Sequence, residues 1–252
     1  MQRLFCHTHI VRYDESNCAG VLTPTAFVRY MQDIAARDAE DAQLGGNGFW
    51  IVKRTHITFN VPVPIHTKLL LKTYGLAFTR ITAQRGYEAY LEAAESPIIS
   101  ARTLWVFLDP RGRPTRLPED TARIWLPDGP REPQAEESFP VFPDGEPVTM
   151  GESVRFADID IMRHMNNAAA VEKLDNAAWE AYARAGITPD TTRFDALSYD
   201  IEYLHSPRFG EPLVIQSWLE PVVGEECARW QQVMQGDKVV VRAFSRWRVD
   251  AV

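Results

Sequence analysis

The sequence predicts an α+β protein that consists of two similar halves, each with one helix packed against antiparallel strands. The first observation is an internal repeat, because a shift of about 144 positions places Trp50 on Phe194 and Arg85 on Arg229. A repeat of this length exceeds a solenoid unit and indicates a duplicated domain. The second is a proline-rich stretch between the copies. The third is the same order of one helix and four strand-like runs in each copy.

The first copy begins with a helix and continues with strands. Thr23 is a suitable N-cap, and Pro24 occupies the first helical position, where its missing N–H does no harm. Apolar residues then recur at helical spacing until Gly45-Gly46 ends the run. Four strand-like runs follow, at about 50–60, 67–78, 81–92 and 98–109.

The stretch between the copies is rich in proline. Nine of the seventeen prolines lie from Pro110 to Pro147, together with acidic residues and few aliphatic ones. Proline fixes φ and removes a backbone donor, so this composition favours an extended connector over a packed element. We therefore expect an N-terminal domain at 1–110, a linker at 111–147 and a C-terminal domain at 148–252.

The second copy repeats the pattern of the first. Asn166 or Asn167 can cap a helix that extends to Gly186, and strand-like runs follow at about 195–205, 212–222, 225–236 and 238–249. A helix and a meander of strands bury their apolar sides against each other as one α+β layer. Two such sheets placed edge to edge would form one continuous sheet with both helices on the same side.

The composition is that of an ordinary soluble globular protein, with 45% hydrophobic and 24% charged residues among 252. The net charge of −7 argues against a nucleic-acid partner, which would need a basic face. No segment approaches the roughly 20 apolar residues of a membrane span, and the first residues lack the apolar run of a signal peptide. We expect a cytoplasmic protein whose three cysteines are free and show no metal-type spacing.

Ionisable and amide side chains gather directly before the second helix. They are Asp160, His164, Asn166 and Asn167. The unpaired N–H groups and the dipole at a helix start favour negative charge, such as the oxyanion that forms on a reacting carbonyl. The alternative is that an asparagine only caps the helix and that the histidine lies in a surface loop. In the first copy, Val21 or Gly20 stands opposite the histidine.

Glu202 is a second candidate in the same half. It lies in a strand between the apolar residues Ile201 and Tyr203, and the first copy has Thr58 at its position. A carboxylate in a half-buried strand tends to have a raised pKa, which suits a general base. The alternative is that Glu202 points to solvent from the polar face of the strand.

These residues resemble the signature of a known family. The run Asp158-Ile-Asp-Ile-Met-Arg-His-Met-Asn-Asn167 is similar to the D-x-D-x-N-x-H-V-N-N motif of the fatty acyl-ACP thioesterases of plant plastids and bacteria. The segments Met31-Gln-Asp-Ile-Ala35 and Trp50-Ile-Val52 resemble the first helix and the W-V-L strand of that family. The resemblance implies two tandem hotdog domains that form a pseudo-dimer with two central helices. It also implies catalytic positions at Asp160, His164 and Glu202, without a metal or a cofactor.

The chain departs from the family pattern at two positions of the motif region. Met162 replaces the asparagine between the aspartate and the histidine, and Ala170 replaces an aromatic residue. No cysteine follows Glu202 closely, since Cys227 is the next one along the chain. Attack by water is therefore the simpler hypothesis than a cysteine nucleophile.

The expected reaction is hydrolysis of a fatty acyl thioester, most simply acyl-ACP. Glu202 and Asp160 would orient and deprotonate a water molecule, and His164 with the helix start would stabilise the oxyanion. Asn166, Asn167 and the position of Met162 would serve to hold or position the reacting groups. The first half would receive the acyl chain without taking part in the chemistry. Candidate wall residues, which ordinary core packing would explain equally, are Phe27, Met31, Ile34 and Trp50.

Three alternatives remain open. The carrier could be coenzyme A instead of acyl carrier protein, because the chemistry is the same. A hydratase is a second alternative, since hotdog domains also host Asp/His pairs that add water to enoyl thioesters. A non-catalytic module that binds acyl thioesters is the third, and Met162 is its best support. A homodimer of two such chains is compatible with the sequence.

Overall fold

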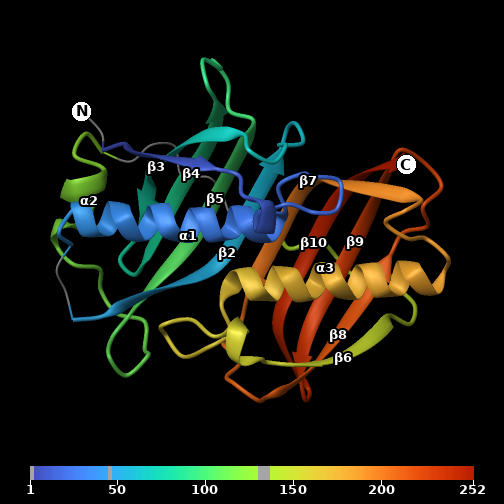
Figure 1. Ribbon diagram of the computed structural model, residues 1–252. Helices are drawn as coiled ribbons and strands as arrows, with labels where there is room; N and C mark the ends of the chain where they lie inside the picture. Colours follow the sequence, from blue (N-terminus) through green and yellow to red (C-terminus); the bar gives the residue numbers. More distant parts are fainter. Residues whose placement is uncertain (1–2, 45–46, 130–136) are drawn as a thin grey trace.

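The computed structural model describes residues 3–44, 47–129 and 137–252, and these form one layer of strands covered by two long helices (Figure 1). The helices are α1 (Pro24–Asp41), the short α2 (Asp120–Trp125) and α3 (Asn167–Arg184), with single 3₁₀ turns η1 (Tyr13–Glu15) and η2 (Phe156–Asp158). The strands of the first half are β1 (Phe5–Ile10), β2 (Phe49–Phe59), β3 (Lys68–Phe78), β4 (Thr82–Leu91) and β5 (Ile99–Leu108). Those of the second half are β6 (Val148–Ser153), β7 (Thr192–Tyr203), β8 (Pro212–Leu219), β9 (Glu226–Gln235) and β10 (Lys238–Ala251).

All ten strands belong to one antiparallel sheet with the order β1-β3-β4-β5-β2-β7-β10-β9-β8-β6. The order of the second half mirrors that of the first, and the halves join where β2 pairs with β7. In that pair His56 faces Asp200, and the two positions differ by 144, the repeat length. Equivalent residues meet only on a symmetry axis, so a pseudo-twofold axis passes through this pair. The predicted continuous sheet is confirmed.

The two long helices lie on the same face of the sheet and run in opposite directions (Figure 1). An ion pair of 3.0 Å between Arg29 and Glu172 connects them. Apolar side chains of both halves form one buried core beneath them, including Ile34, Leu174 and Ile201. This arrangement confirms the predicted α+β layer with two central helices. None of the described helices is long and apolar enough to span a membrane.

The two long helices and eight strands were predicted from the sequence, but α2 and the edge strands β1 and β6 were not. β6 is exposed or half-buried along its whole length, and β1 is half-buried at alternate residues only. Edge strands pack one face at most, so their apolar alternation is weak. The end of α1 also differs, since the helix stops at Asp41 and Gly45-Gly46 lie outside the described residues.

The linker is not extended throughout, because it contains α2. Its described second part crosses the sheet face opposite α1 and α3. Arg54 of β2 donates to the carbonyl of Glu137 at 2.6 Å, and Trp218 of β8 donates to the carbonyl of Gly145 at 2.8 Å. Residues 130–136 of the linker lie outside the described residues. The domain limits 1–110, 111–147 and 148–252 stay predictions.

Candidate active site

The loops that lead into α1 and α3 have the same shape. Each contains a 3₁₀ turn, η1 or η2, and a short β-bridge. Gly20 and Arg163 occupy equivalent positions in the left-handed region, with φ of 71° and 62°. Arg163 is not a residue that favours this conformation. The shared geometry therefore belongs to the duplicated backbone and not to one residue type.

The shared shape fixes which residues of the two loops correspond. The equivalent positions of Gly20 and Arg163 differ by 143, so Val21 lies opposite His164 and Asn17 lies opposite Asp160. Of the two partners that the repeat allowed for His164, Val21 is the equivalent one. The second loop thus carries two ionisable side chains where the first loop carries none.

Asp160, His164 and Asn166 come together at the start of α3. Asn166 is the N-cap, since its side-chain oxygen accepts from the Ala168 N–H at 2.8 Å. Its amide Nδ2 donates to Asp160 Oδ2 at 3.3 Å, while Asp160 Oδ1 lies 3.7 Å from His164 Nδ1. The side chains of Asp160 and His164 are 22% and 23% exposed. The cluster is therefore ordered by its own contacts and still open to a substrate.

The other two predicted positioning residues lie at the borders of this cluster. Asn167 is the first residue of α3 and is half-buried. Met162 is 42% exposed, and its backbone N–H donates to Asp160 Oδ1 at 2.9 Å. Met162 thus helps to orient the Asp160 carboxylate through its backbone, whatever its side chain is.

A buried ion pair anchors the loop from below. Asp158 Oδ2 lies 2.9 Å from Lys173 Nζ, and both side chains are almost fully buried. Burial raises the pKa of Asp158, but hydrogen bonds from Lys173 and Arg155 outweigh that effect and the net pKa lies below the usual value. In the first copy Glu15 and Tyr30 occupy the two positions and are joined by a hydrogen bond of 2.5 Å. Sequence reasoning missed this support, although Lys173 stands out as a cation within an apolar helix stripe.

Glu202 lies on the other side of the sheet from this cluster. Its neighbours Ile201 and Tyr203 are buried in the core beneath the helices. Successive side chains of a strand point to opposite faces, so Glu202 faces away from α3. Its Oε2 accepts from Arg242 Nε at 2.6 Å, and its Oε1 lies 3.5 Å from Arg54 Nη1. The structure therefore brings Asp160 and His164 together but does not bring Glu202 to them.

The surroundings of Glu202 explain why a carboxylate occurs in this strand. Arg54 also forms a bidentate pair with Asp200, at 2.8 and 2.6 Å. The ring of Phe139, from the linker, lies 4.3 Å from the Arg242 guanidinium and 5.7 Å from that of Arg54. These contacts hold the linker on the outer face of the sheet.

His205 is a titratable residue beside the candidate site that the sequence reasoning missed. It is the second residue after β7 and is exposed. Two residues later, the carbonyl of Pro207 accepts from the Met165 N–H at 2.7 Å, so the loop after β7 lies against the loop that carries His164.

A cavity of about 220 Å³ lies in the first half, between the second half of α1 and the sheet. Its wall is mostly apolar, and on α1 it consists of Gln32 and three alanines. The two helices start 143 positions apart, at Pro24 and Asn167. At this offset the residues of α3 that correspond to Ala36 and Ala39 are Trp179 and Tyr182. Those two rings pack on Phe194 at 5.1 and 4.9 Å. The cavity on that side, of about 730 Å³, lies between Trp179, Phe194 and the loop before α1, and polar and charged residues form much of its wall. The residues that line the cavity of the first half are Gln32, Ala35, Ala36, Ala39, Leu44, Trp50, Gly75, Phe78, Ala83, Gln84, Arg85, Trp105, Thr121 and Trp125.

Of the four predicted acyl-binding residues, Trp50 lines this cavity. Phe27, Met31 and Ile34 are 1%, 4% and 1% exposed and belong to the core between α1 and the sheet. The helical spacing identified the buried face of α1 correctly. It could not show that the cavity opens farther along the helix, beside alanines.

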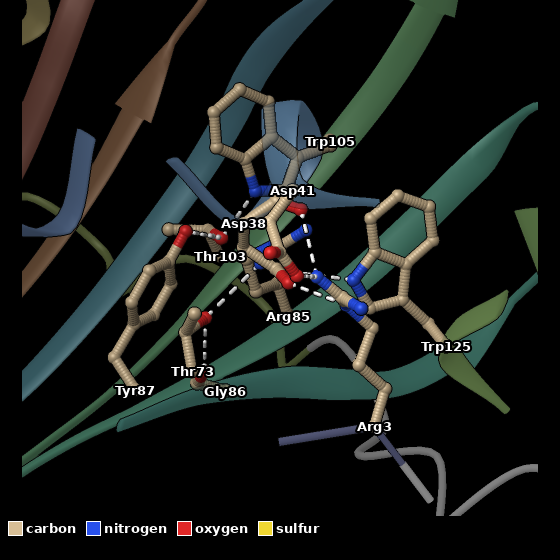
Figure 2. Close-up of polar contacts among 10 residues, drawn as sticks. All are labelled: Arg3, Asp38, Asp41, Thr73, Arg85, Gly86, Tyr87, Thr103, Trp105 and Trp125. Atoms are coloured by element: carbon tan, nitrogen blue, oxygen red, sulfur yellow. Dashed lines mark hydrogen bonds and ion pairs between the residues drawn. The ribbon is translucent and has the colours of Figure 1, made fainter. Parts of the chain in front are cut away.

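A buried polar cluster closes one end of the cavity (Figure 2). Asp38 of α1 is fully buried, and its Oδ2 accepts from Arg85 Nη1 at 2.5 Å and from Trp125 Nε1 at 2.6 Å. Arg3 Nε donates to its other oxygen at 2.6 Å. Gly75 leaves room for this closure, because a Cβ there would lie 3.0 Å from the Cβ of Trp125. The linker helix α2 thus forms part of the cavity wall.

The start of α3 lies beside the start of α1, and the two helices run in opposite directions (Figure 1). Arg29 pairs with Glu172 across them. The cavity follows farther along α1, where Gln32, Ala35, Ala36 and Ala39 line it. The candidate site and the cavity therefore both border α1.

Comparisons with known families agree with the duplication. Residues 2–125 match the model of the acyl-ACP thioesterase N-terminal domain, and residues 154–248 match that of the thioesterase-like superfamily. No curated protein matches the chain.

Solved structures with the same fold cover nearly the whole chain. A Lactobacillus plantarum protein described as an oleoyl thioesterase is 17% identical, with a TM-score of 0.84 over 98% of this chain and 96% of that one. The 12:0-ACP thioesterase from Umbellularia californica is 15% identical, with a TM-score of 0.80 over 98% of this chain and 94% of that one. An acyl-ACP thioesterase from Bacteroides thetaiotaomicron is 16% identical, with a TM-score of 0.77 over 97% of this chain and 98% of that one. At these identities the matches establish the fold, and they confirm the tandem hotdog arrangement.

Proposed function

Because the chain belongs to the acyl-ACP thioesterase family, a family of thioester hydrolases, we propose that it hydrolyses fatty acyl thioesters carried on acyl carrier protein. One observation carries the proposal. The Asp160–His164–Asn166 cluster lies at the start of α3 beside α1 of the opposite half, and a largely apolar cavity lies farther along α1. The reacting thioester would lie at the cluster, and its acyl chain would extend into the cavity.

In the proposed reaction His164 activates water. Its Nδ1 lies 3.2 Å from the Met165 carbonyl and 3.7 Å from Asp160 Oδ1, so both neighbours are acceptors that favour a proton on this nitrogen. The other ring nitrogen, Nε2, is then free to accept a proton from water. The water oxygen forms a bond to the thioester carbon, the C–S bond breaks, and the proton passes from His164 to the departing thiolate.

The first turn of α3 would stabilise the oxyanion of the tetrahedral intermediate. The first N–H groups of a helix have no acceptor within the helix, and the dipole there favours negative charge. Asn166 fixes this end of α3, and Asn167 lies at its first position. A donor of this kind typically lowers the activation barrier by about 2.7–4 kcal/mol.

Glu202 has no part in this mechanism. Its pairs with Arg242 and Arg54 occupy the outer face of the sheet, where the linker lies. In the proposed mechanism the general base is therefore the Asp160–His164 pair and not Glu202, which the sequence had predicted.

The test is the release of free thiol from a panel of acyl-ACPs and matched acyl-CoAs of increasing chain length. We expect turnover of acyl-ACP, with a preference for chains that fill the cavity. Faster turnover of acyl-CoA would show that coenzyme A, and not acyl carrier protein, is the preferred carrier of the acyl group. Saturable binding of the acyl-ACPs and acyl-CoAs without thiol release would contradict hydrolysis and favour the binding module, to which Met162 in place of the family asparagine points.

A further inference from the structure

Two histidines and an aspartate form a cluster at the outer edge of the first half. His7 and His9 are alternate residues of the edge strand β1, so both side chains point to the same face of the sheet. Asp33 of α1 lies opposite them. One possible ligand atom from each residue lies within 4.8 Å of the other two. Strand and helix thus present three metal-binding side chains to one point.

His9 carries an unexplained polar atom in this cluster. Its Nε2 is buried and has no hydrogen-bond partner among the residues that the structure describes. It lies 3.5 Å from Asp33 Oδ2. Buried polar atoms are nearly always satisfied, so such an atom calls for a partner. Two ligands at 2.0–2.1 Å from a tetrahedral zinc ion lie about 3.3 Å apart. The separation of the two atoms fits a shared metal ion.

We propose that His7, His9 and Asp33 bind one divalent transition-metal ion of the zinc class. Two imidazoles and one carboxylate suit zinc, copper or nickel, whereas calcium and magnesium prefer oxygen ligands. Water would complete a four-coordinate shell, since Asp33 is 40% exposed and the site reaches the surface.

A second residue of α1 holds the Asp33 carboxylate in position. Arg37 Nε donates to Asp33 Oδ2 at 2.7 Å and holds the carboxylate in place, as outer-shell partners of metal ligands do.

The bound ion would fasten an edge of the molecule. Among the strands that the structure describes, β1 is an edge strand that pairs only with β3. A metal shared by His9 and Asp33 would connect β1 directly to α1, the helix that carries the cavity wall.

The test is a zinc titration of the tag-free chain after treatment with a chelator, followed by calorimetry and by the melting temperature. We expect one zinc ion per chain and a melting temperature that rises with zinc. Cobalt in the same site should give the visible absorption of a four-coordinate ion. His9→Ala and Asp33→Asn should weaken binding by at least about 10-fold, the lower end of the loss seen even for outer-shell partners.

His66→Asn is the matched control, because His66 is an exposed histidine with a positive φ that asparagine tolerates. It should bind zinc like the wild type, and far-UV circular dichroism should show that all variants fold. The proposal is overturned if the wild type binds no zinc saturably, or if His9→Ala and Asp33→Asn bind it with wild-type affinity. The readout is metal binding, so it is independent of thioester hydrolysis.

Discussion

The loop before α3 carries Asp160 and His164, whereas the loop before α1 has the same backbone and carries Asn17 and Val21. Asn17 Oδ1 accepts from two backbone N–H groups of its own loop, at 3.0 Å each, and so maintains the turn without a charge. The loop shape therefore does not depend on the ionisable groups. Asp160 accepts the equivalent hydrogen bond from the Met162 N–H at 2.9 Å, so the turn does not need its charge, which is consistent with the proposed chemical role.

The two halves differ in the opposite sense in their interiors. The first half has alanines at positions 36 and 39 of α1 beside a mostly apolar cavity, while the second half has Trp179 and Tyr182, and the cavity beside Trp179 is lined largely by polar and charged residues. One half thus carries the proposed reactive groups and the other carries the mostly apolar cavity. Since the start of each helix lies beside the other half, both parts could contribute to one site.

The equivalent arginines Arg85 and Arg229 show a third difference. Arg85 is neutralised by the buried Asp38, at 2.5 Å. Arg229 is fully buried between aromatic rings, 3.9 Å from the Trp247 ring centre, and its nitrogens have no hydrogen-bond partner among the described residues. Its nearest carboxylate oxygen, on Asp175, is 3.9 Å away. The same cation is thus held by a salt bridge in one half and by π-systems in the other.

The largest expected effect separates the two loops. His164→Ala should lower kcat for acyl-ACP roughly 10²–10⁴-fold, the usual contribution of a positioned general base. The melting temperature should change little, because the first copy keeps the same loop with Val21. Steady-state kinetics and a thermal melt would measure both.

Glu202→Gln is the matched comparison on the other face of the sheet. It should keep kcat near the wild-type value, because Glu202 faces away from the cluster. An equal loss of kcat in both variants would return Glu202 to the catalytic role and break the assignment.

The next effect concerns the two arginines. Asp38→Asn should lower the free energy of unfolding by about 3–5 kcal/mol, because it leaves a buried guanidinium without its counter-charge. Arg229→Met should lower it by less, because the Asp175 carboxylate lies 3.9 Å from the guanidinium and keeps its hydrogen bond from Tyr199. Chemical denaturation of both variants tests the contrast. A larger loss for Arg229→Met would show that the aromatic rings stabilise the cation better than Asp38 does.

A smaller effect should distinguish the two interiors. Ala39→Tyr introduces the residue that α3 has at the equivalent position and should shorten the preferred acyl chain. Loss of contact with two methylene groups costs about 1.6 kcal/mol, or roughly 15-fold in kcat/KM for the longest substrates. The control is Ala183→Tyr, on the exposed side of α3. An unchanged chain-length profile in Ala39→Tyr would contradict an acyl chain in this cavity.

The smallest effect concerns the pseudo-twofold axis. Burial lowers the pKa of His56 to about 4, although Asp200 opposes this shift. Unfolded His56 binds a proton near pH 6.5, so lowering the pH from 6.5 towards 4 favours the unfolded chain. The contribution is on the order of 1–2 kcal/mol after allowance for partial exposure. His56→Gln should reduce the slope of unfolding free energy against pH in this window, and an unchanged slope would contradict the shift.

The internal repeat of the sequence allowed the architecture to be predicted. Trp50 and Phe194, or Arg85 and Arg229, mark the same strand positions twice, so the sheet and both helices could be predicted. The edge strands could not, because β6 buries none of its side chains. The helix α2 lies among prolines, and its Trp125 is held by Asp38, a contact 87 residues away that no local pattern reveals.

The site was predictable only where its residues are close in sequence. Asp160, His164 and Asn166 lie in one loop, and the capping pattern alone placed them at a helix start. Glu202 follows the alternation of its strand, since Ile201 and Tyr203 face the core and Glu202 lies on the opposite face, as the alternative interpretation of the sequence had it. The cavity was missed along most of its length because small residues reveal empty space only in comparison with the larger residues of the other copy.

The linker that joins β5 to β6 has an evolutionary consequence. In a symmetric dimer of identical chains every substitution appears twice, so a tryptophan that improves one interior also blocks the other. Once two copies are fused, each mutation occurs once per molecule. Selection could then place Trp179 in the second interior and discard the first histidine without losing a partner, an option closed to any homodimeric ancestor.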